Sequence, residues 1–322
     1  PMPTREAEWK PAECATGVSP VSASPSQPPV KEALLTLLAH PNIASKHKII
    51  RQYDHEVQGN TVVRPLGGPL QRGPMDAAVI EPVPGSGKGL AIATGLATNF
   101  GDPEAGGDPY LMALAAIDEV VRNLVCVGAD PDRIAILDNF CWPSCKKPQN
   151  LASLVRAAEG CYDAAKAYRT PFVSGKDSLN NQFTIPGENG EAARTIEIPP
   201  TLLITGIGIV PDITKCVTMD AKRAGNNLVI IENRPNAHID RLDNTKRVGG
   251  SHLAAQFGVP ENADPRTPRP DSVSGAKTAR VIAEIIRRGY AVSAHDASEG
   301  GPLVAVAEML IAGSSPDSPL GA

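Results

Sequence analysis

The chain has 322 residues, of which 42% are hydrophobic and 20% charged, and its formal net charge is −4. This length accommodates two domains with real cores, and the charge gives no electrostatic reason to expect a nucleic acid or an anionic membrane as partner. No apolar run approaches the ~18 residues of a membrane span, and the six cysteines follow no disulfide spacing, so we expect a reducing, cytoplasmic setting.

The N-terminal part, residues 1–44, is interpreted as a Pro/Ser-rich linker with a short helix at 30–40, because its scattered prolines cannot order themselves. One domain is expected over 45–214 and a second, truncated one over 215–322. Apolar runs between Gly/Pro turns predict strands, and longer runs with helical spacing predict helices. In chain order we expect strands at 61–66, 75–83 and 89–95, a helix at 106–130, a strand at 132–140, a helix at 149–168, strands at 171–175, 201–210 and 225–232, a helix at 274–288, a strand at 290–294 and a helix at 302–312.

A first phosphate-loop candidate, VPGSGKGLA at 83–91, does not match the residue pattern of a P-loop. A P-loop requires Ser or Thr after its Gly-Lys pair to bind magnesium, and Gly89 stands there instead. We therefore interpret this stretch as a flexible turn before a strand.

A second candidate, PFVSGKDSLNNQF at 171–183, does not match the P-loop pattern either, but it lies at the end of a predicted strand, where a phosphate-binding turn is more plausible. A strand that ends in Ser-Gly exposes backbone N–H groups, and Lys176 and Ser178 add a cation and a hydroxyl beside Gly175. On chemistry alone, a phosphate-binding turn and an ordinary polar turn both remain open.

Several oxygen-bearing side chains could hold a hard cation. Glu119 and Asn123 project from one face of the helix at 106–130, although both could equally be surface residues. Asp76 lies in an apolar strand-like run, where a carboxylate needs a cation or donors to offset its desolvation.

The stretch HDASEGGPLVAVAEM, at 295–309, joins a strand end to a helix start. Ser298 can cap that helix, and Asp296 stands beside a helix N-terminus that attracts anions, which is where magnesium bridges carboxylates to phosphates. A simple capped helix explains the same residues.

Five stretches occur in the order GGDPYLMALAAIDEVVRN, GADPDRIAILDNFCW, PFVSGKDSLNN, TGIGIVPD and HDASEGG. Together they resemble the second half of the phosphoribosylformylglycinamidine synthase family over roughly residues 45–322. The resemblance implies an α+β fold: a PurM-like N-terminal-type ATP-binding domain with an antiparallel sheet over 45–214, then a partial PurM-like C-terminal-type α/β domain over 215–322.

The reaction implied by the resemblance belongs to purine biosynthesis. ATP phosphorylates the amide oxygen of formylglycinamide ribonucleotide, and ammonia then displaces phosphate to give the amidine. The implied partners are a first PurM-like half, which pairs through its sheet, and a glutaminase domain or subunit that supplies ammonia. The family's catalytic histidine belongs to the first half and has no counterpart here, so this polypeptide is expected not to complete the reaction alone.

By position, the resemblance implies two sites. In the active site, Asp138, Gly175 and Lys176 hold the nucleotide and Ser178 contacts substrate; Lys176 stands where shorter members have a metal-binding asparagine, so direct charge on a phosphate could replace a metal contact. The resemblance also implies an auxiliary nucleotide site, with ADP as a possible occupant. Its implied magnesium ligands are Asp76, Glu119, Asn123 and Asp296, and its implied nucleotide contacts are Met75 and Ser298.

Two other hypotheses for the function of the chain remain. The chain could be a nucleotide-binding scaffold without catalysis, or a small-molecule kinase of the same fold, such as a thiamine-phosphate kinase. Nucleotide binding without turnover would favour the scaffold, and phosphate transfer to an acceptor without any need for ammonia would favour the kinase.

Overall fold

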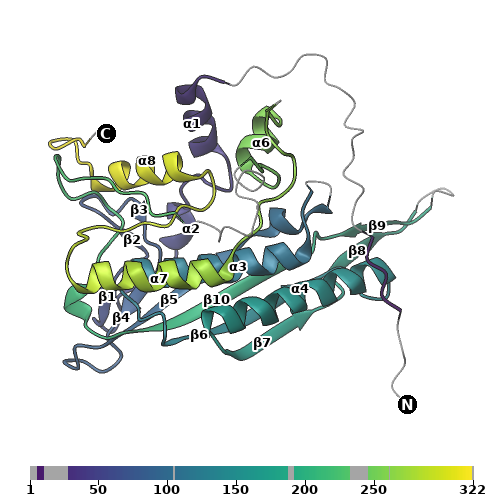
Figure 1. Ribbon diagram of the computed structural model, residues 1–322, viewed down its shortest axis with the longest axis horizontal. Helices are drawn as coiled ribbons and strands as arrows, with labels where there is room; N and C mark the ends of the chain where they lie inside the picture. Colours follow the sequence, from purple (N-terminus) through teal and green to yellow (C-terminus); the bar gives the residue numbers. More distant parts are fainter. Residues whose placement is uncertain are drawn as a thin grey trace.

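The computed structural model describes residues 6–10, 28–103, 106–187, 192–232, 246–260 and 262–320 (Figure 1). Most of the expected linker, residues 1–5 and 11–27, lies outside these. The helices are α1 Val30–Ala39, α2 His47–Ile50, η1 Thr98–Gly101, α3 Pro109–Cys126, α4 Pro148–Tyr168, η3 Ile213–Lys215, α6 His252–Phe257, α7 Ser272–Arg287 and α8 Pro302–Gly313. The strands are β1 Thr61–Val63, β2 Leu66–Gly67, β3 Gly73–Pro74, β4 Ala78–Ile80, β5 Gly89–Leu96, β6 Ile134–Cys141, β7 Phe172–Ser178, β8 Gln182–Ile185, β9 Arg194–Glu197 and β10 Thr201–Val210.

A six-stranded sheet with the order β1-β4-β5-β10-β6-β7 forms the base of the fold. Its neighbouring strands run antiparallel except β6 and β7, which are parallel. Two hairpins, β2-β3 and β8-β9, stand beside it. The expected α+β class with a mostly antiparallel sheet is confirmed.

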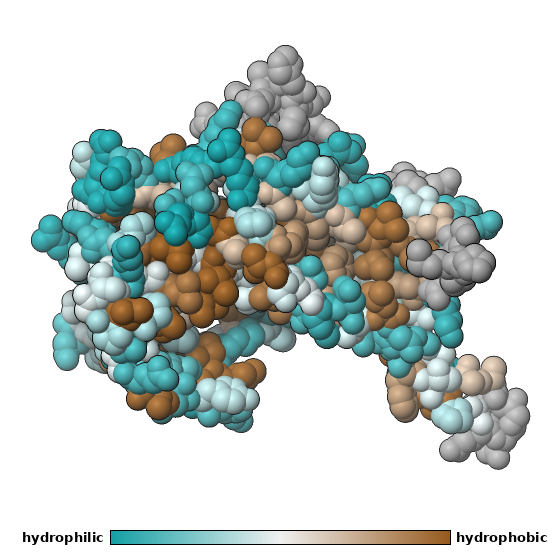
Figure 2. Space-filling view, turned by 90° about the horizontal axis from the view of Figure 1, so that it is seen from below, coloured by the Kyte–Doolittle hydropathy of each residue, from teal (hydrophilic) through white to brown (hydrophobic). Residues whose placement is uncertain are grey.

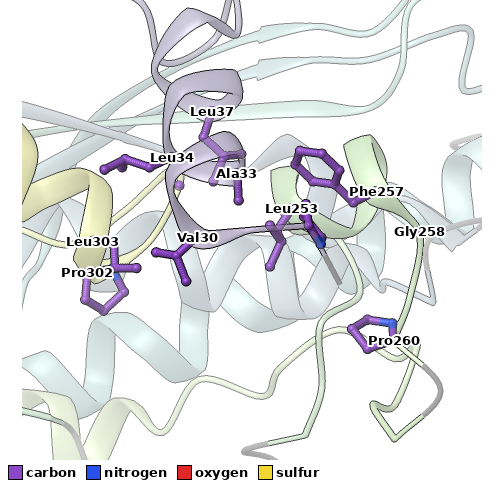
Figure 3. Close-up of a pocket in the computed structure, with 12 residues that line it drawn as sticks. Val30, Ala33, Leu34, Leu37, Leu253, Phe257, Gly258, Pro260, Pro302 and Leu303 are labelled. Atoms are coloured by element: carbon purple, nitrogen blue, oxygen red, sulfur yellow. The ribbon is translucent and has the colours of Figure 1, made fainter. Parts of the chain in front are cut away.

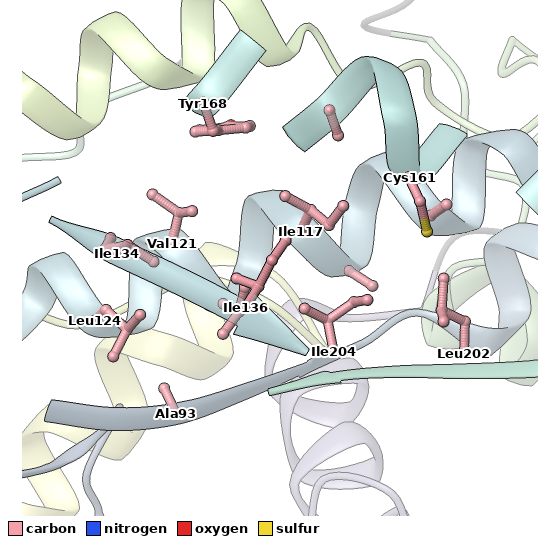
Figure 4. Close-up of a cluster of buried hydrophobic side chains, with 14 of the residues drawn as sticks. Ala93, Ile117, Val121, Leu124, Ile134, Ile136, Cys161, Tyr168, Leu202 and Ile204 are labelled. Carbon is pink, nitrogen blue, oxygen red and sulfur yellow. The ribbon is translucent and has the colours of Figure 1, made fainter. Parts of the chain in front are cut away.

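Helices cover one face of this sheet, where α3 packs on β5 and β10 and is flanked by α4 and α7 (Figure 1). Side chains alternate along a strand, so β10 buries every second residue, including Leu202 and Ile204. These meet helix side chains such as Ile117 and Cys161 in a continuous core (Figure 4). The opposite face of the sheet keeps partly exposed residues, such as Ile92 and Leu96 on β5.

Helix α3 carries several candidate site residues, and it begins and ends where the capping residues in the sequence predict. The Asp108 side chain accepts a hydrogen bond from the N–H of Tyr110, Pro109 occupies the first turn, and Gly128 just beyond the end has φ 99°. The helix lies against β5 so closely that a Cβ on Gly95 would stand 2.0 Å from the Ala116 carbonyl oxygen. Glycine at 95 therefore fixes the depth of α3 on the sheet.

The second half of the chain differs from the sequence prediction in its strands. The helices α7 and α8 form as expected, but among the described residues of 215–322 there are only isolated bridges, such as Thr218 with Ser293. The strands predicted at 225–232 and 290–294 are wrong. Both segments are apolar enough for a strand, but among the described residues neither pairs with a strand beyond the single bridge of Ser293 to Thr218, and Val229 remains 72% exposed. In the part of the chain described, no helix is both long and apolar enough to cross a membrane.

Candidate functional site

Two buried carboxylates, Asp76 and Asp296, lie together although they are far apart in the sequence. Asp76 stands in a bend just before β4, not inside the strand as expected, and its Oδ1 accepts a hydrogen bond of 2.8 Å from the backbone N–H of Asp296. Their side chains are only 2% and 3% exposed. The Oδ2 atoms of both are buried and have no hydrogen-bond partner among the described residues. Each carboxylate therefore has capacity for a further donor or a cation.

His295, which is not among the residues expected at this site, contacts this pair. His295 Nδ1 lies 2.8 Å from Asp76 Oδ1, and its Nε2 lies 3.1 Å from Glu308 Oε2 on α8. Burial acts to lower the pKa of His295, but the hydrogen bonds to Asp76 and Glu308 outweigh it and raise the pKa to about 9. The charged imidazolium donates to both carboxylates and ties the segment before α8 to the entry of β4.

Arg122 on α3 joins the same cluster from the other side. Its Nε donates to Asp118 Oδ2 over 2.7 Å, one turn earlier on α3, and its guanidinium pairs with Asp296 Oδ1. Tyr168 at the end of α4 donates its hydroxyl hydrogen to Asp118. Asp118 and Arg122 form the i, i+4 pair that the helix spacing predicts, but the structure adds Asp296 as a second acid.

Glu119 and Asn123, the other two expected magnesium ligands, lie together on α3 against the end of β5. Glu119 Oε2 accepts from the N–H of Leu96 over 2.7 Å, and Asn123 donates to the carbonyl of Thr94 over 3.0 Å. Burial, followed by the charge of Glu299, raises the pKa of Glu119 to about 7. Both side chains already bind the backbone of β5. Among the described residues, no three acidic, His or Cys side chains are arranged to hold a metal ion.

A cavity of about 340 Å³ opens beside the cluster formed by Asp118, Arg122, His295 and Asp296. Its remaining lining is mainly apolar, from α3, α7, α8 and the segment 228–231. A second cavity, of about 290 Å³, lies between α1, α6 and α8 (Figure 3). Its described lining, which includes Leu34, Leu253 and Leu303, offers no polar side chain, so of these two cavities the first has the groups that could bind a charged ligand.

The two residues expected to touch an auxiliary nucleotide lie at the margins of this cluster. Met75 is partly buried and packs so tightly over the β2–β3 hairpin that a Cβ on Gly67 would stand 2.5 Å from its Cε. Ser298 is exposed. The prediction that Ser298 caps α8 is wrong: the N-cap is Gly301, in a left-handed conformation, and no side chain caps the helix.

The other expected site lies at the β6–β7 edge of the sheet, with β5 and β10 between it and β4. Asp138 on β6 stands opposite Gly175 on β7, and a Cβ at 175 would lie 2.6 Å from Asp138 Oδ1. Burial and the charge of Asp177 raise the pKa of Asp138. Gly175 is thus required because the Asp138 carboxylate occupies the space of its missing side chain.

The stretch around Gly175 is not the turn that the sequence predicts. Residues Phe172–Ser178 all belong to β7, and Gly175 does not have a positive φ. The strand continues because β6 pairs with it as far as Ser178. Successive side chains of a strand point to opposite faces, so Lys176 points away from Asp138 and donates to Asn139 Oδ1 over 3.2 Å.

Ser178 ends β7 opposite Cys141 and lies in the same alternation as Lys176. The face toward which they point is the one that α3 leaves uncovered. Toward the middle of the sheet this face carries Ile92 and Leu96, which are 39% and 41% exposed. Apolar surface is also visible when the molecule is seen from below (Figure 2).

Comparison with known proteins identifies relatives for most of the chain. Residues 74–210 match the family described as AIR synthase related protein, N-terminal domain. The chain is 37% identical over 281 residues to the phosphoribosylformylglycinamidine synthase subunit PurL of Deinococcus radiodurans, which covers 87% of this chain and 34% of that protein. The corresponding subunit of a Synechococcus species is 36% identical over 284 residues, with 87% and 35% covered.

Among solved structures, Thermotoga maritima PurL complexed with FGAR aligns with 89% of this chain and 39% of that one, with a TM-score of 0.52 at 16% identity. This likeness supports the fold alone. The chain spans about one third of the length of the curated relatives it matches.

Proposed function

Residues 74–210 form an AIR synthase related domain and the chain as a whole is related to the PurL subunits, and from this premise we propose that it is part of a phosphoribosylformylglycinamidine synthase. In that reaction ATP phosphorylates the amide oxygen of formylglycinamide ribonucleotide, and ammonia derived from glutamine displaces the phosphate. The observation that carries the proposal is the 37% identity over 87% of the chain. The geometry of the two sets of residues supports it.

The β6–β7 edge is the proposed position of the reacting nucleotide. Lys176 and Ser178 offer an ammonium group and a hydroxyl on one face of the strand, and these suit phosphate oxygens. Asp138 lies on the other face and repels phosphate, so we assign it to hydroxyl groups or to a cation that accompanies the nucleotide. A single nucleotide can contact both Lys176 on one face of the sheet and Asp138 on the other only if it extends around the outer edge of β7.

Lys176 and Asn139 are already in contact, and this contact orients the ammonium group. A fixed cation stabilises the negative charge that develops as the phosphoryl group is transferred. No histidine lies among the residues of this edge, and the proposed acid–base chemistry belongs to the first half of the enzyme.

Asp76 and Asp296 are the proposed magnesium ligands of an auxiliary nucleotide site. Their two unpartnered buried oxygens fit a hard cation, since magnesium binds carboxylate oxygens and completes its shell with phosphates and water. Bound there, magnesium would neutralise phosphate charge. His295 and Glu308 hold Asp76 in place. Among the described residues Glu119 does not form a metal-holding group with this pair. The contacts with β5 use Glu119 Oε2 and the Asn123 amide nitrogen, so Glu119 Oε1 and Asn123 Oδ1 are not occupied by them.

The uncovered face of the sheet is the proposed contact with the first PurM-like half. Ile92 and Leu96 lie in its middle, on either side of Thr94, and exposed apolar residues on an uncovered sheet face are typical of a protein interface. The pairing would place Lys176 and Ser178 at the seam between halves. A glutaminase domain or subunit supplies the ammonia in this proposal.

The test is turnover of the full-length protein with ATP, ammonium and formylglycinamide ribonucleotide, followed as ADP release. Lys176→Ala is expected to lower kcat at least tenfold, since it removes charge from the phosphoryl group. The matched control is Lys166→Ala, because Lys166 is an exposed lysine on α4 whose ammonium contacts Tyr162. Nucleotide binding without ADP release would indicate a scaffold, and ammonia-independent phosphate transfer to an alcohol or phosphate would indicate a kinase. Either result contradicts the proposal.

A further inference from the structure

Arg122 stands between two acids that come from different parts of the fold. Asp118 is one turn earlier on α3, and Asp296 lies in the segment before α8. The guanidinium also donates to the carbonyl of Ala297 over 3.3 Å. The Arg122 side chain is 33% exposed, and it lines the larger cavity together with both acids.

Arg122 satisfies only part of the charge in this cluster. It pairs with Oδ1 of Asp296, while Oδ2 of Asp296 and Oδ2 of Asp76 stay buried without a hydrogen-bond partner in the described residues. The cluster holds four carboxyl groups against two basic side chains. The acids are Asp76, Asp118, Asp296 and Glu308, and the basic side chains are Arg122 and His295.

Such a cluster is costly in a cation-free protein unless it carries its own positive charge. We propose that Arg122 is the resident counter-ion of this cluster: its guanidinium neutralises Asp118 and Asp296 while no divalent cation is bound, and its charge weakens the binding of a divalent cation to Asp296. The inference rests on the divalent-cation site of the proposed function. Arg122 is a positioning residue, because it acts on the site through Asp296.

The competing explanation is a structural bridge between α3 and the segment before α8, in which Arg122 holds Asp296 ready for the metal. The two explanations predict opposite signs. A bridge that positions Asp296 would make cation binding weaker when it is removed. A counter-ion that competes with the cation would make binding tighter, because the two acids are left without compensation.

The experiment measures Mn²⁺ binding to the full-length protein by electron paramagnetic resonance, without nucleotide. Arg122→Met keeps most of the side-chain length and removes the charge, and it is expected to bind Mn²⁺ about tenfold more tightly or better, since unit charges a few ångströms apart interact by more than the energy of a tenfold change. Arg122→Lys keeps the charge and is expected to stay within about threefold of the unchanged protein. The matched control is Arg280→Met, because Arg280 pairs with the exposed Asp132 at 2.6 Å, outside the cluster.

A second readout is thermal stability. Arg122→Met is expected to melt at a lower temperature than the unchanged protein in chelator and to recover with Mn²⁺, as ligand binding to the folded state requires. Adding Asp296→Asn to Arg122→Met is expected to abolish the gain in Mn²⁺ affinity. That result would show that the gain depends on the Asp296 carboxylate.

The inference is overturned if Arg122→Met binds Mn²⁺ no more tightly than the unchanged protein, or if Arg122→Lys behaves as Arg122→Met. If neither protein binds Mn²⁺, the cation site of the proposed function fails as well; if only the variant binds, the counter-ion is supported and the native magnesium site is refuted. Should Arg122→Met not fold, Asp118→Asn with Arg122→Met removes one charge of each sign. Because Arg122 pairs with Asp296 directly, that protein is still expected to bind Mn²⁺ more tightly than the unchanged protein; equal or weaker binding overturns the inference.

Discussion

The contact between Gly175 and Asp138 gives the sharpest test of the β6–β7 site. In Gly175→Ala the new Cβ would stand 2.6 Å from Asp138 Oδ1 and 2.8 Å from Oδ2, so the carboxylate must move by about 0.8 Å to reach an ordinary contact of 3.4 Å. Overpacking of this kind costs about 1–3 kcal/mol. Because the backbone at 175 does not have a positive φ, alanine also brings a gain of about 0.5–1 kcal/mol over glycine in a strand.

The two effects separate in a double-mutant cycle, measured as the free energy of unfolding in urea. Gly175→Ala alone is expected to lose up to about 2.5 kcal/mol, whereas in an Asp138→Ala background it should gain about 0.5–1 kcal/mol. The coupling is therefore about 1–3 kcal/mol. Ser174→Ala, whose side chain belongs to the other face of β7, should show a coupling to Asp138 below about 0.5 kcal/mol. A Gly175–Asp138 coupling that small would refute the packing argument.

Three further predictions concern other contacts. Tyr168→Phe removes the hydroxyl that donates to Asp118 and should lower the free energy of unfolding by about 1–2 kcal/mol in urea; an unchanged value would remove this hydrogen bond from the account of the cluster. Burial, then the charge of His40, lowers the pKa of His252 below 6.5, so the folded protein resists protonation and loses stability as the pH falls below 6.5. His252→Asn should flatten this loss in melting temperatures taken between pH 4.5 and 7.5, and an equally steep profile would contradict it. Ile92→Lys, at a residue 39% exposed, should leave the unfolding of this chain within about 0.5 kcal/mol, yet weaken its association with a first-half partner in calorimetry; undiminished association would exclude the open sheet face.

Local signals in the sequence were sufficient for most of the helices and strands. Asp108, Pro109 and Gly128 predicted the ends of α3 because capping and left-handed turns depend on neighbouring residues only. The apolar run at 201–210 predicted β10 for the same reason. The run at 225–232 misled because strand propensity is realised only when another strand pairs with it, and none does among the described residues.

The candidate site was predictable in its residue types but not in its contacts. Asp76 and Asp296 were expected to act together, and they do lie together. Helix spacing alone indicates only an i, i+4 pair of Arg122 with Asp118, since nothing local shows that a segment far along the chain will lie against Arg122. His295 precedes Asp296 in the sequence, and that adjacency was the available signal for its role.

The uncovered sheet face combines an apolar middle with a polar edge strand. Protein interfaces have an apolar middle and a polar rim, and this face changes in the same way, from Ile92 and Leu96 on β5 to Lys176 and Ser178 on the edge strand β7. A partner on the apolar middle would exclude water from the rim without covering the free edge of β7. The attraction between the Lys176 ammonium group and a phosphate bound there would be stronger than in this chain alone, because the effective dielectric constant around them would be lower. If pairing creates the site in this way, Lys176→Ala should weaken nucleotide binding more in the paired protein than in the isolated chain; an equal loss in both would show that the edge works without a partner.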